Sequence, residues 1–271
     1  TVLVLYGDVP LIQPETLRAL TEACHADSIS VLTVQSTDPT GLGRILRDEQ
    51  NRVLAIVEEK DANPQQKLIQ ETNSGILAAP AGRLRGWLAA LSPKNAQGEY
   101  YLTDIIASAV ADNCEVASLI LEDELEVLGV NNKFQLAQLE RHYQGRIAEQ
   151  LLFAGVGLAD PARIDVRGTL QCGRDVEIDI NAIFEGQVTL GNGVHIGPNV
   201  VIKNSDIGDG THILANCHIE ESSIAANCAI GPFARLRTGT NLADGAKIGN
   251  FVETKKAIVG KGSKINHLSY V

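Results

Sequence analysis

The segment that decides the fold is LGNGVHIGPNVVIKNSDIGDG, residues Leu190–Gly210. A large apolar residue returns in it at every sixth position, with one step shortened to five, and glycine often follows that residue. An α-helix repeats every 3.6 residues and a strand repeats every two, so neither period fits. A period of six is typical of a β-helix, in which three short strands form each coil and the apolar residues stack inside.

The same period continues in both directions from this segment, with slips of one residue. Its positions are Val166, Cys172, Ile178, Phe184, Leu190, Ile196, Ile202, Ile207, Ile213, Ile219, Ile224, Ile230, Leu236, Leu242, Ile248, Val259, Ile265 and Val271. Coils of about 18 residues would give about six coils over this stretch. We therefore predict a left-handed parallel β-helix of hexapeptide repeats over residues 156–271.

The chain before residue 130 follows a different pattern, because apolar segments alternate there with segments of helical spacing. The predicted strands are residues 1–6, 29–34, two within 43–61, 73–79, 115–122 and 124–130, and the predicted helices are 14–24, 82–92 and 103–113. This alternation favours an α/β domain of Rossmann-like type, with a mostly parallel sheet covered on both faces.

A third pattern lies between these two regions. Leu136, Leu139, Tyr143, Ile147 and Leu151 follow one another at steps of three or four, with polar residues between them, which predicts one amphipathic helix. The predicted division is therefore an α/β domain over residues 1–132, a connecting helix over 133–155 and the β-helix over 156–271.

Composition narrows the class of protein. The 271 residues contain no methionine and the first of them already read as a strand, so we expect an internal piece of a longer chain. No apolar run approaches the roughly 18 residues of a membrane-spanning helix, so no membrane insertion is expected. Five cysteines without CxxC spacing predict a cytoplasmic protein with free thiols.

Charge gives a second constraint on function. The net charge of −10 argues against a general nucleic-acid-binding protein. Residues 231–271 nevertheless carry seven Lys or Arg against two acids. This local excess fits either a small anionic ligand or a solvated basic face.

Two positions in the first domain are candidates for metal binding. Asp8 directly follows the apolar run VLVLYG, at the end of a strand where ligands of open α/β sheets collect, although Gly-Asp there also makes an ordinary turn. Gly7 would let a ligand approach the backbone. In LGVNN, Asn131 or Asn132 could cap the next helix, or an amide oxygen could join a carboxylate on Mg²⁺.

The histidines divide into two groups. His212 and His218 lie one repeat apart and would fall on adjacent faces, and no third histidine has matching spacing, so a zinc site is not expected. His267 differs because a lysine-rich stretch precedes it and Tyr270 follows. A neutral imidazole beside a phosphate-binding cluster is a candidate general base.

Taken together, these segments resemble the family of bifunctional bacterial enzymes that make UDP-N-acetylglucosamine. Members of that family combine N-acetylglucosamine-1-phosphate uridyltransferase with glucosamine-1-phosphate N-acetyltransferase. The motifs that carry the resemblance run in order along almost the whole chain. They are LYGDVPLI, DPTGLGRI, IVEEKDA, NSGIL, QGEYYLTDII, GVNN, RGTL, GRDVEID, IGPFARLR, GNFVETKK and GKGSKINHLSY.

The resemblance implies a role for residues in each domain. In the nucleotidyltransferase domain Asp8 and Asn131 would hold Mg²⁺, while a second set would line the sugar-nucleotide site. That second set is Tyr6, Gly7, Gly43, Glu58, Asn73 and Thr103. In the β-helix Arg237 and Lys255 would bind the phosphate of glucosamine 1-phosphate beside Tyr270, and His267 would accept the proton of the sugar amine.

The resemblance also implies the reactions and the partners. Acetyl-CoA would acetylate glucosamine 1-phosphate, and UTP would then react with N-acetylglucosamine 1-phosphate and release pyrophosphate. The product is a precursor of peptidoglycan and lipopolysaccharide, and the family assembles as homotrimers through the β-helix. The Gly-rich UTP loop and the later coils of the family have no counterpart in this chain, so it is expected to have little of either activity by itself.

Two other functions remain open from the residues alone. One is a monofunctional sugar-1-phosphate nucleotidyltransferase whose β-helix serves regulation or assembly, which would not use acetyl-CoA. The other is a non-catalytic scaffold, in which substitution of Asp8 or His267 would have no effect.

Overall fold

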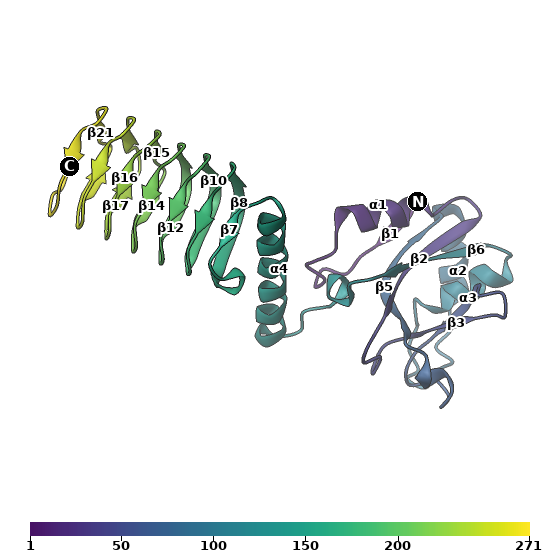
Figure 1. The fold of residues 1–271 in the computed structure, drawn as a ribbon. Helices are drawn as coiled ribbons and strands as arrows, with labels where there is room; N and C mark the ends of the chain where they lie inside the picture. Colours follow the sequence, from purple (N-terminus) through teal and green to yellow (C-terminus); the bar gives the residue numbers. More distant parts are fainter. The chain divides into compact units, whose positions relative to one another are not determined.

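The computed structural model describes residues 1–271, which form two compact units, Thr1–Leu139 and Glu140–Val271. Figure 1 shows a sheet with helices in the first unit and a stack of parallel coils in the second. Helix α4 (Lys133–Phe153) contains the boundary between the units. None of the helices combines the length and the apolar character that a membrane-spanning segment needs.

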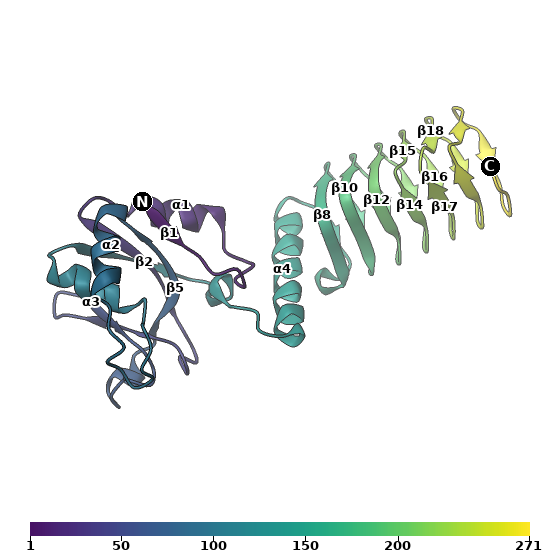
Figure 2. The same ribbon diagram turned by 180° about the vertical axis from the view of Figure 1, so that it is seen from behind.

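The first unit is built on one six-stranded sheet with helices on both faces, visible from behind in Figure 2. Leu20 packs with Leu32 on one face, while Trp87 and Ile105 pack with Val31 on the other. The predicted covering of both faces is therefore confirmed. The elements of this unit are β1 (Val2–Val4), α1 (Pro14–Glu22), β2 (Ser28–Gln35), β3 (Arg44–Arg47), β4 (Val53–Val57), η1 (Gln66–Leu68), β5 (Glu71–Ala79), α2 (Ala81–Ala90), α3 (Asp104–Ala111), β6 (Glu115–Leu121) and η2 (Glu124–Val127).

The expectation of a mostly parallel sheet is wrong. The strand order is β4-β3-β5-β2-β6, with β1 also beside β5, and only β2 and β6 pair in parallel. No α-helix lies between β2 and β5. Parallel neighbours need a crossover of a dozen or more residues, and residues 48–52 between β3 and β4 are too few for one, so these two strands pair antiparallel.

The segment after β6 also differs from the prediction. Residues 124–130 were expected to be extended, but Glu124–Val127 form the 3₁₀ turn η2. The Asp123 carboxylate accepts a hydrogen bond from the Leu125 amide at 3.0 Å and so caps this turn. Glu126, which is 8% exposed, accepts a hydrogen bond from the Gln13 amide, and this contact ties the turn to the start of α1.

The second unit is a parallel β-solenoid of about six turns, as the six-residue period predicts. Its strands are β7 (Gly157–Leu158), β8 (Ile164–Cys172), β9 (Glu177–Ile178), β10 (Ala182–Leu190), β11 (His195–Ile196), β12 (Val201–Ile207), β13 (His212–Ile213), β14 (His218–Glu220), β15 (Ser223–Ile224), β16 (Ala229–Ile230), β17 (Arg235–Arg237), β18 (Asn241–Leu242), β19 (Lys247–Ile248), β20 (Glu253–Lys255), β21 (Ile258–Val259) and β22 (Lys264–Ile265). A short 3₁₀ turn, η3 (Pro161–Arg163), precedes β8.

Coil length explains the slips in the sequence period. Ile164 pairs with Ala182 and His195 pairs with His212, so one coil takes 18 or 17 residues. A five-residue step belongs to a shorter coil, and the register of the inward residues is kept. Thr254 takes the inward position that the apolar series skips. It is fully buried, and its hydroxyl bonds that of Thr240 at 3.0 Å.

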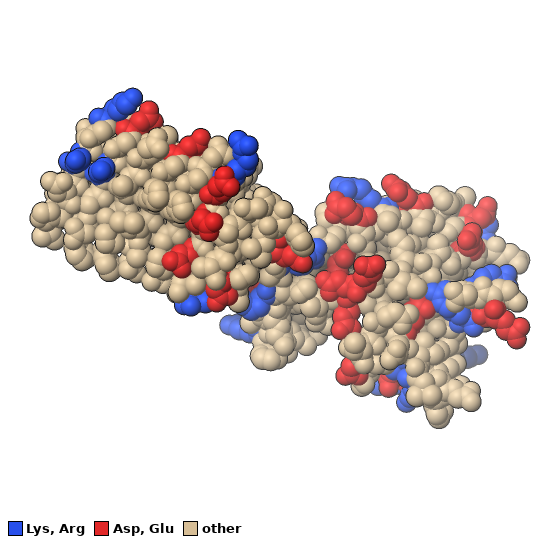
Figure 3. Space-filling view, in the orientation of Figure 1, with Lys and Arg blue, Asp and Glu red and all other residues tan.

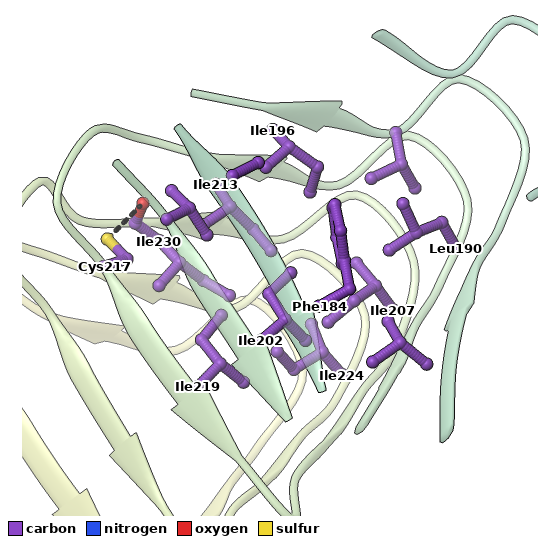
Figure 4. Packing of buried hydrophobic residues seen from close by; sticks show 14 of the residues in the cluster. Phe184, Leu190, Ile196, Ile202, Ile207, Ile213, Cys217, Ile219, Ile224 and Ile230 are labelled. Carbon is purple, nitrogen blue, oxygen red and sulfur yellow. Dashed lines mark hydrogen bonds between the residues drawn. The ribbon is translucent and has the colours of Figure 1, made fainter. Parts of the chain in front are cut away.

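The interior of the solenoid is a column of aliphatic side chains (Figure 4). Phe184, Ile202, Ile219 and Leu236 are each at most 1% exposed. Tyr270 is the bridge partner of Glu253, so Val271 is in register with the inward residue Thr254, as the period predicts.

The corners of the coils form ladders of their own. Asn181, Asn199 and Asn216 adopt left-handed backbone conformations, with φ of 60°, 58° and 62°. Their amides bond one another from coil to coil at 2.8 and 3.2 Å. At the same corner of the next two coils Phe233 and Phe251 stack, with ring centroids 5.2 Å apart. Asparagine tolerates this conformation better than most residues, so these corners are set by local sequence.

The column predicts that two isoleucines of the solenoid differ in their contribution to stability. Ile219→Ala removes a fully buried side chain and is expected to lower the free energy of unfolding of the solenoid by about 2–5 kcal/mol. Ile258→Ala is the control, because Ile258 is 85% exposed and its loss should change that free energy by less than about 0.5 kcal/mol.

Urea unfolding followed by far-UV circular dichroism measures both variants. The single tryptophan, Trp87, lies in the first unit, so its fluorescence reports that unit separately and should not change. Equal losses of unfolding free energy in the two variants would contradict the claim that Ile219 points into the column and Ile258 does not.

Candidate functional sites

A cavity of about 270 Å³ in the first unit brings together five of the residues singled out in the sequence. It lies beside the start of β3 and the turn before α3. Its lining is Tyr6, Gly41, Leu42, Gly43, Glu58, Asn73, Ser74, Gly75, Tyr100, Tyr101, Leu102 and Thr103. The structure therefore gathers Tyr6, Gly43, Glu58, Asn73 and Thr103 around one space.

Hydrogen bonds fix the polar side of this cavity. The Thr103 hydroxyl donates to Oε1 of Glu58 at 2.8 Å. The backbone N–H of Asn73 donates to the carbonyl of Gly43 at 2.9 Å. A Cβ on Gly43 would lie 3.0 Å from Ile56 and 3.4 Å from the Glu58 carboxylate. The backbone at Gly43 therefore lies close to Glu58, and a side chain there would displace the carboxylate.

A tyrosine and a glycine define one wall. Gly75 has φ of +82°, and a Cβ at this position would lie 2.0 Å from the ring of Tyr6. Glycine is therefore required twice, for its backbone conformation and for the ring that lies against it. Tyr6 is 48% exposed, so its ring lies both against the backbone and against solvent at the cavity.

Burial raises the pKa of two titratable groups near the cavity, Tyr101 and Asp104. Burial raises the pKa of the Tyr101 phenol, and the charges of Asp61, Glu99 and Glu58 raise it further. Burial also raises the pKa of the Asp104 carboxyl, with a smaller contribution from Asp61. The Tyr101 oxygen accepts a hydrogen bond from the Gln97 side chain at 2.8 Å, and this contact opposes the rise in pKa.

The two predicted metal ligands lie on neighbouring segments. The Val130 amide donates to the carbonyl of Asp8 at 2.8 Å, and a Cβ on Gly129 would lie 3.5 Å from the Asp8 carboxylate. Asn132 caps α4, because its Oδ1 accepts from the Gln135 amide at 3.0 Å. Its neighbour Asn131 uses only its backbone amide in that cap, which bonds Oε1 of Gln135.

The side-chain oxygens of Asp8 and Asn131 are of the type that Mg²⁺ prefers. No group of three or more His, Cys, Asp or Glu side chains could hold a metal ion by itself. Mg²⁺ prefers oxygen, usually binds one or two carboxylates, and takes its remaining ligands from water and substrate phosphates. One carboxylate at Asp8 and one amide oxygen at Asn131 match that pattern. A Cβ added to Gly7, next to Asp8, would have no atom within 4 Å.

A second cluster lies on one side of the solenoid, near the C-terminal end, where Figure 3 shows several basic side chains. Arg237 on β17 is the register partner of Lys255 on β20. The next coil follows directly, since the Lys255 amide donates to the carbonyl of Val271 at 2.9 Å and Tyr270 bridges to Glu253. Three of the predicted side chains therefore come from consecutive coils.

One carboxylate organises the basic side chains of this cluster. Oε1 of Glu253 accepts from Arg237 at 3.0 Å and lies 3.9 Å from Arg235. Lys255 has no acidic partner in the structure. The cluster thus keeps a positive charge that an anionic ligand could neutralise.

His267 lies in the turn after β22 and before the bridge at Tyr270, and it is exposed. The Ser269 hydroxyl donates to the His267 carbonyl at 3.0 Å, which fixes the backbone of this turn. No hydrogen bond or ion pair joins the imidazole to Arg237 or Lys255. The structure therefore places His267 on the coil next to Lys255, without a direct contact between the two side chains.

Sequence reasoning missed two arrangements. His195 and His212 stack with ring centroids 4.6 Å apart, beside a groove of about 450 Å³ on another side of the solenoid. Their separation equals one 17-residue coil, so the slipped period could have revealed the pair. The buried Arg44 forms an ion pair with the half-buried Glu59, and no pattern in the sequence signals it.

Comparison with known proteins gives matches to both units. A family model described as the GMPPB C-terminal domain matches residues 166–267. The protein named Bifunctional protein GlmU of Paraburkholderia phytofirmans is 56% identical over 269 residues, which are 99% of this chain and 59% of that protein. Its namesake of Marinobacter nauticus is 58% identical over 270 residues, or 60% of its length.

The chain therefore spans about three fifths of the length of the curated relatives it matches. Among solved structures, the acetyltransferase domain of PglB from Neisseria gonorrhoeae aligns with 70% of each chain, at 14% identity and a TM-score of 0.33. A score that low carries no argument about this protein.

The contact between Gly75 and Tyr6 predicts a specific effect on stability. Gly75→Ala is expected to destabilise the first unit by about 1–3 kcal/mol, because its Cβ adds a clash with the ring to the strain of positive φ. Gly98→Ala is the matched control. Gly98 also has positive φ, at +68°, but no atom lies within 4 Å of its Cβ position, so the change should cost about 1 kcal/mol.

Thermal unfolding followed by Trp87 fluorescence compares the two variants. The same midpoint for both would mean that the Tyr6 ring does not lie against Gly75.

Proposed function

This chain is homologous, over almost its whole length, to the proteins named bifunctional protein GlmU, and we propose that it carries residues for both transfers that make UDP-N-acetylglucosamine. It is a transferase in this proposal, acting in the cytoplasm on small phosphorylated sugars. The single observation that best supports the proposal is the cavity that collects Tyr6, Gly43, Glu58, Asn73 and Thr103 from separate segments.

Acetyl transfer is proposed for the solenoid. Arg237 and Lys255 bind the phosphate of glucosamine 1-phosphate, since a guanidinium and an ammonium on adjacent coils form charge-assisted hydrogen bonds to it. Tyr270 lies beside them. The sugar amine attacks the thioester carbon of acetyl-CoA, the C–N bond forms, and the C–S bond breaks to release the CoA thiol. His267 accepts the proton that the amine loses.

Uridylyl transfer is proposed for the first unit. The phosphate of N-acetylglucosamine 1-phosphate attacks the α-phosphorus of UTP, and pyrophosphate leaves. Mg²⁺, when bound, neutralises charge on the phosphates. Asp8 and Asn131 would hold it there, while Glu58, Asn73 and Thr103 orient the sugar nucleotide. This reaction depends on positioning more than on covalent catalysis, which a rigid cavity provides.

Assembly is part of the same proposal. The β-helix would form a homotrimer of cyclic symmetry, with the acetyl-transfer site between neighbouring solenoids. The open position of Arg237, Lys255 and Tyr270 on the outside of one solenoid supports this, because a neighbouring copy could then exclude water from the site.

Phosphate binding by the solenoid is tested with Arg237→Ala. The variant is expected to bind glucosamine 1-phosphate about 10–100 times more weakly, because a charge-assisted hydrogen bond contributes roughly 1.5–3 kcal/mol. Isothermal titration calorimetry measures the dissociation constant. Arg174→Ala is the control, since Arg174 is exposed on a distant coil of the same solenoid. The affinity of this variant for glucosamine 1-phosphate should be unchanged.

The role of His267 is tested by separating binding from turnover. His267→Asn should leave the affinity for glucosamine 1-phosphate within about twofold and lower the release of CoA thiol by roughly 10²–10⁴-fold, the usual contribution of a general base. The thiol assay is run on the full reading frame that contains this chain. Normal thiol release by the variant would remove His267 from the reaction, and no acetyl-CoA use at all would favour a monofunctional enzyme.

A further inference from the structure

The most deeply buried charged side chain of the first unit is Arg44, the first residue of β3, which is 2% exposed. A guanidinium loses its hydration on burial, and this costs several kcal/mol unless ion pairs and hydrogen bonds offset it. Either the contacts of Arg44 offset this cost of desolvation, or the residue is retained for another reason.

Arg44 makes two side-chain contacts. Its Nη2 donates to Oε2 of Glu59 at 2.5 Å, and its Nη1 donates to the carbonyl of Leu42. Its Nε is buried and has no hydrogen-bond partner. Buried polar atoms without partners are rare in native structures, so the compensation of this side chain is incomplete.

Both contacts hold segments that line the cavity of about 270 Å³. Leu42 lies between Gly41 and Gly43, and all three residues belong to the lining. Glu59 directly follows Glu58, whose carboxylate accepts the hydrogen bond from Thr103. One guanidinium thus connects two walls that are otherwise joined by the strand pairing of β3 and β4.

Arg47, at the other end of β3, provides an internal comparison. Its guanidinium binds both carboxylate oxygens of Glu71, at 2.7 and 2.6 Å, and also the Ser118 hydroxyl and the Asn51 carbonyl. None of these partners lines the cavity. Every nitrogen of the Arg47 guanidinium thus has a hydrogen-bond partner, whereas Nε of Arg44 has none and its two bonds reach two cavity walls.

We propose that Arg44 is a positioning residue of this cavity, which holds the turn at Gly41–Gly43 and the carboxylate of Glu58 in the geometry that binds a sugar nucleotide. The identity of the ligand rests on the proposed uridylyl-transfer function. The positioning itself rests only on the contacts of Arg44.

The first measurement uses hydrogen exchange and needs no ligand. Arg44→Met is expected to speed amide exchange at least tenfold in residues 40–43 and 58–61, whereas Arg47→Met should leave these segments unchanged. If Arg44→Met does not fold, Glu59→Gln takes its place, because it keeps the shape of the side chain and removes only the charge of the pair. Equal exchange in the Arg44 and Arg47 variants would overturn the proposal.

The second measurement is calorimetric titration with UDP-N-acetylglucosamine and Mg²⁺, at a temperature where Trp87 fluorescence shows every variant folded. Arg44→Met should weaken binding at least tenfold and Arg47→Met less than twofold, even if both lower the midpoint of unfolding by similar amounts. Arg44→Lys should be intermediate, since one ammonium cannot reach both partners in the planar geometry of a guanidinium.

The two measurements separate the two possible failures. If the full reading frame that contains this chain does not bind UDP-N-acetylglucosamine, the proposed function of the first unit fails, and hydrogen exchange still decides the role of Arg44. If the chain binds and Arg44→Met binds equally well, the positioning role fails while the proposed function stands.

Discussion

The contact on which the solenoid depends is the one between an inward aliphatic side chain and its equivalent in the next coil. Ile202, Ile219 and Leu236 form such a series and are fully buried. Each coil is too small to bury its own apolar residues, so its stability comes from its neighbours. Parallel pairing keeps equivalent residues in register, and this is why a coil of 17 residues in place of 18 does not disturb the column.

Register also decides what lies on the outside of the solenoid. Because each strand pairs with the same strand of the next coil, outward side chains form rows as regular as the inward ones. Arg237 therefore lies beside Lys255, and His195 lies beside His212, although each pair is separated by a full coil of sequence. A chemical group on a β-solenoid is thus assembled by strand register, which is kept in coils of 17 and of 18 residues alike.

The first unit assembles its candidate site by another route. β3 pairs antiparallel with both β4 and β5, and the turn before β3 thereby meets the residues after β4 and the start of α3. Glu58 and Thr103 become hydrogen-bonded across this space. The cavity is a product of strand order and direction, and strand direction was the part of the fold that the alternating pattern predicted incorrectly.

The sequence by itself determined the solenoid, because a period of six repeats locally and specifies both the inward residues and the coil length. Through the motifs that carry the family resemblance it also predicted residues for both candidate sites, and five of those in the first unit lie around one cavity. Only the tertiary structure decided the antiparallel sheet, the meeting of Tyr6 with Gly75, and the burial of Arg44 against Glu59. These depend on contacts between segments far apart in the chain, and no local periodicity reports which segments will become neighbours.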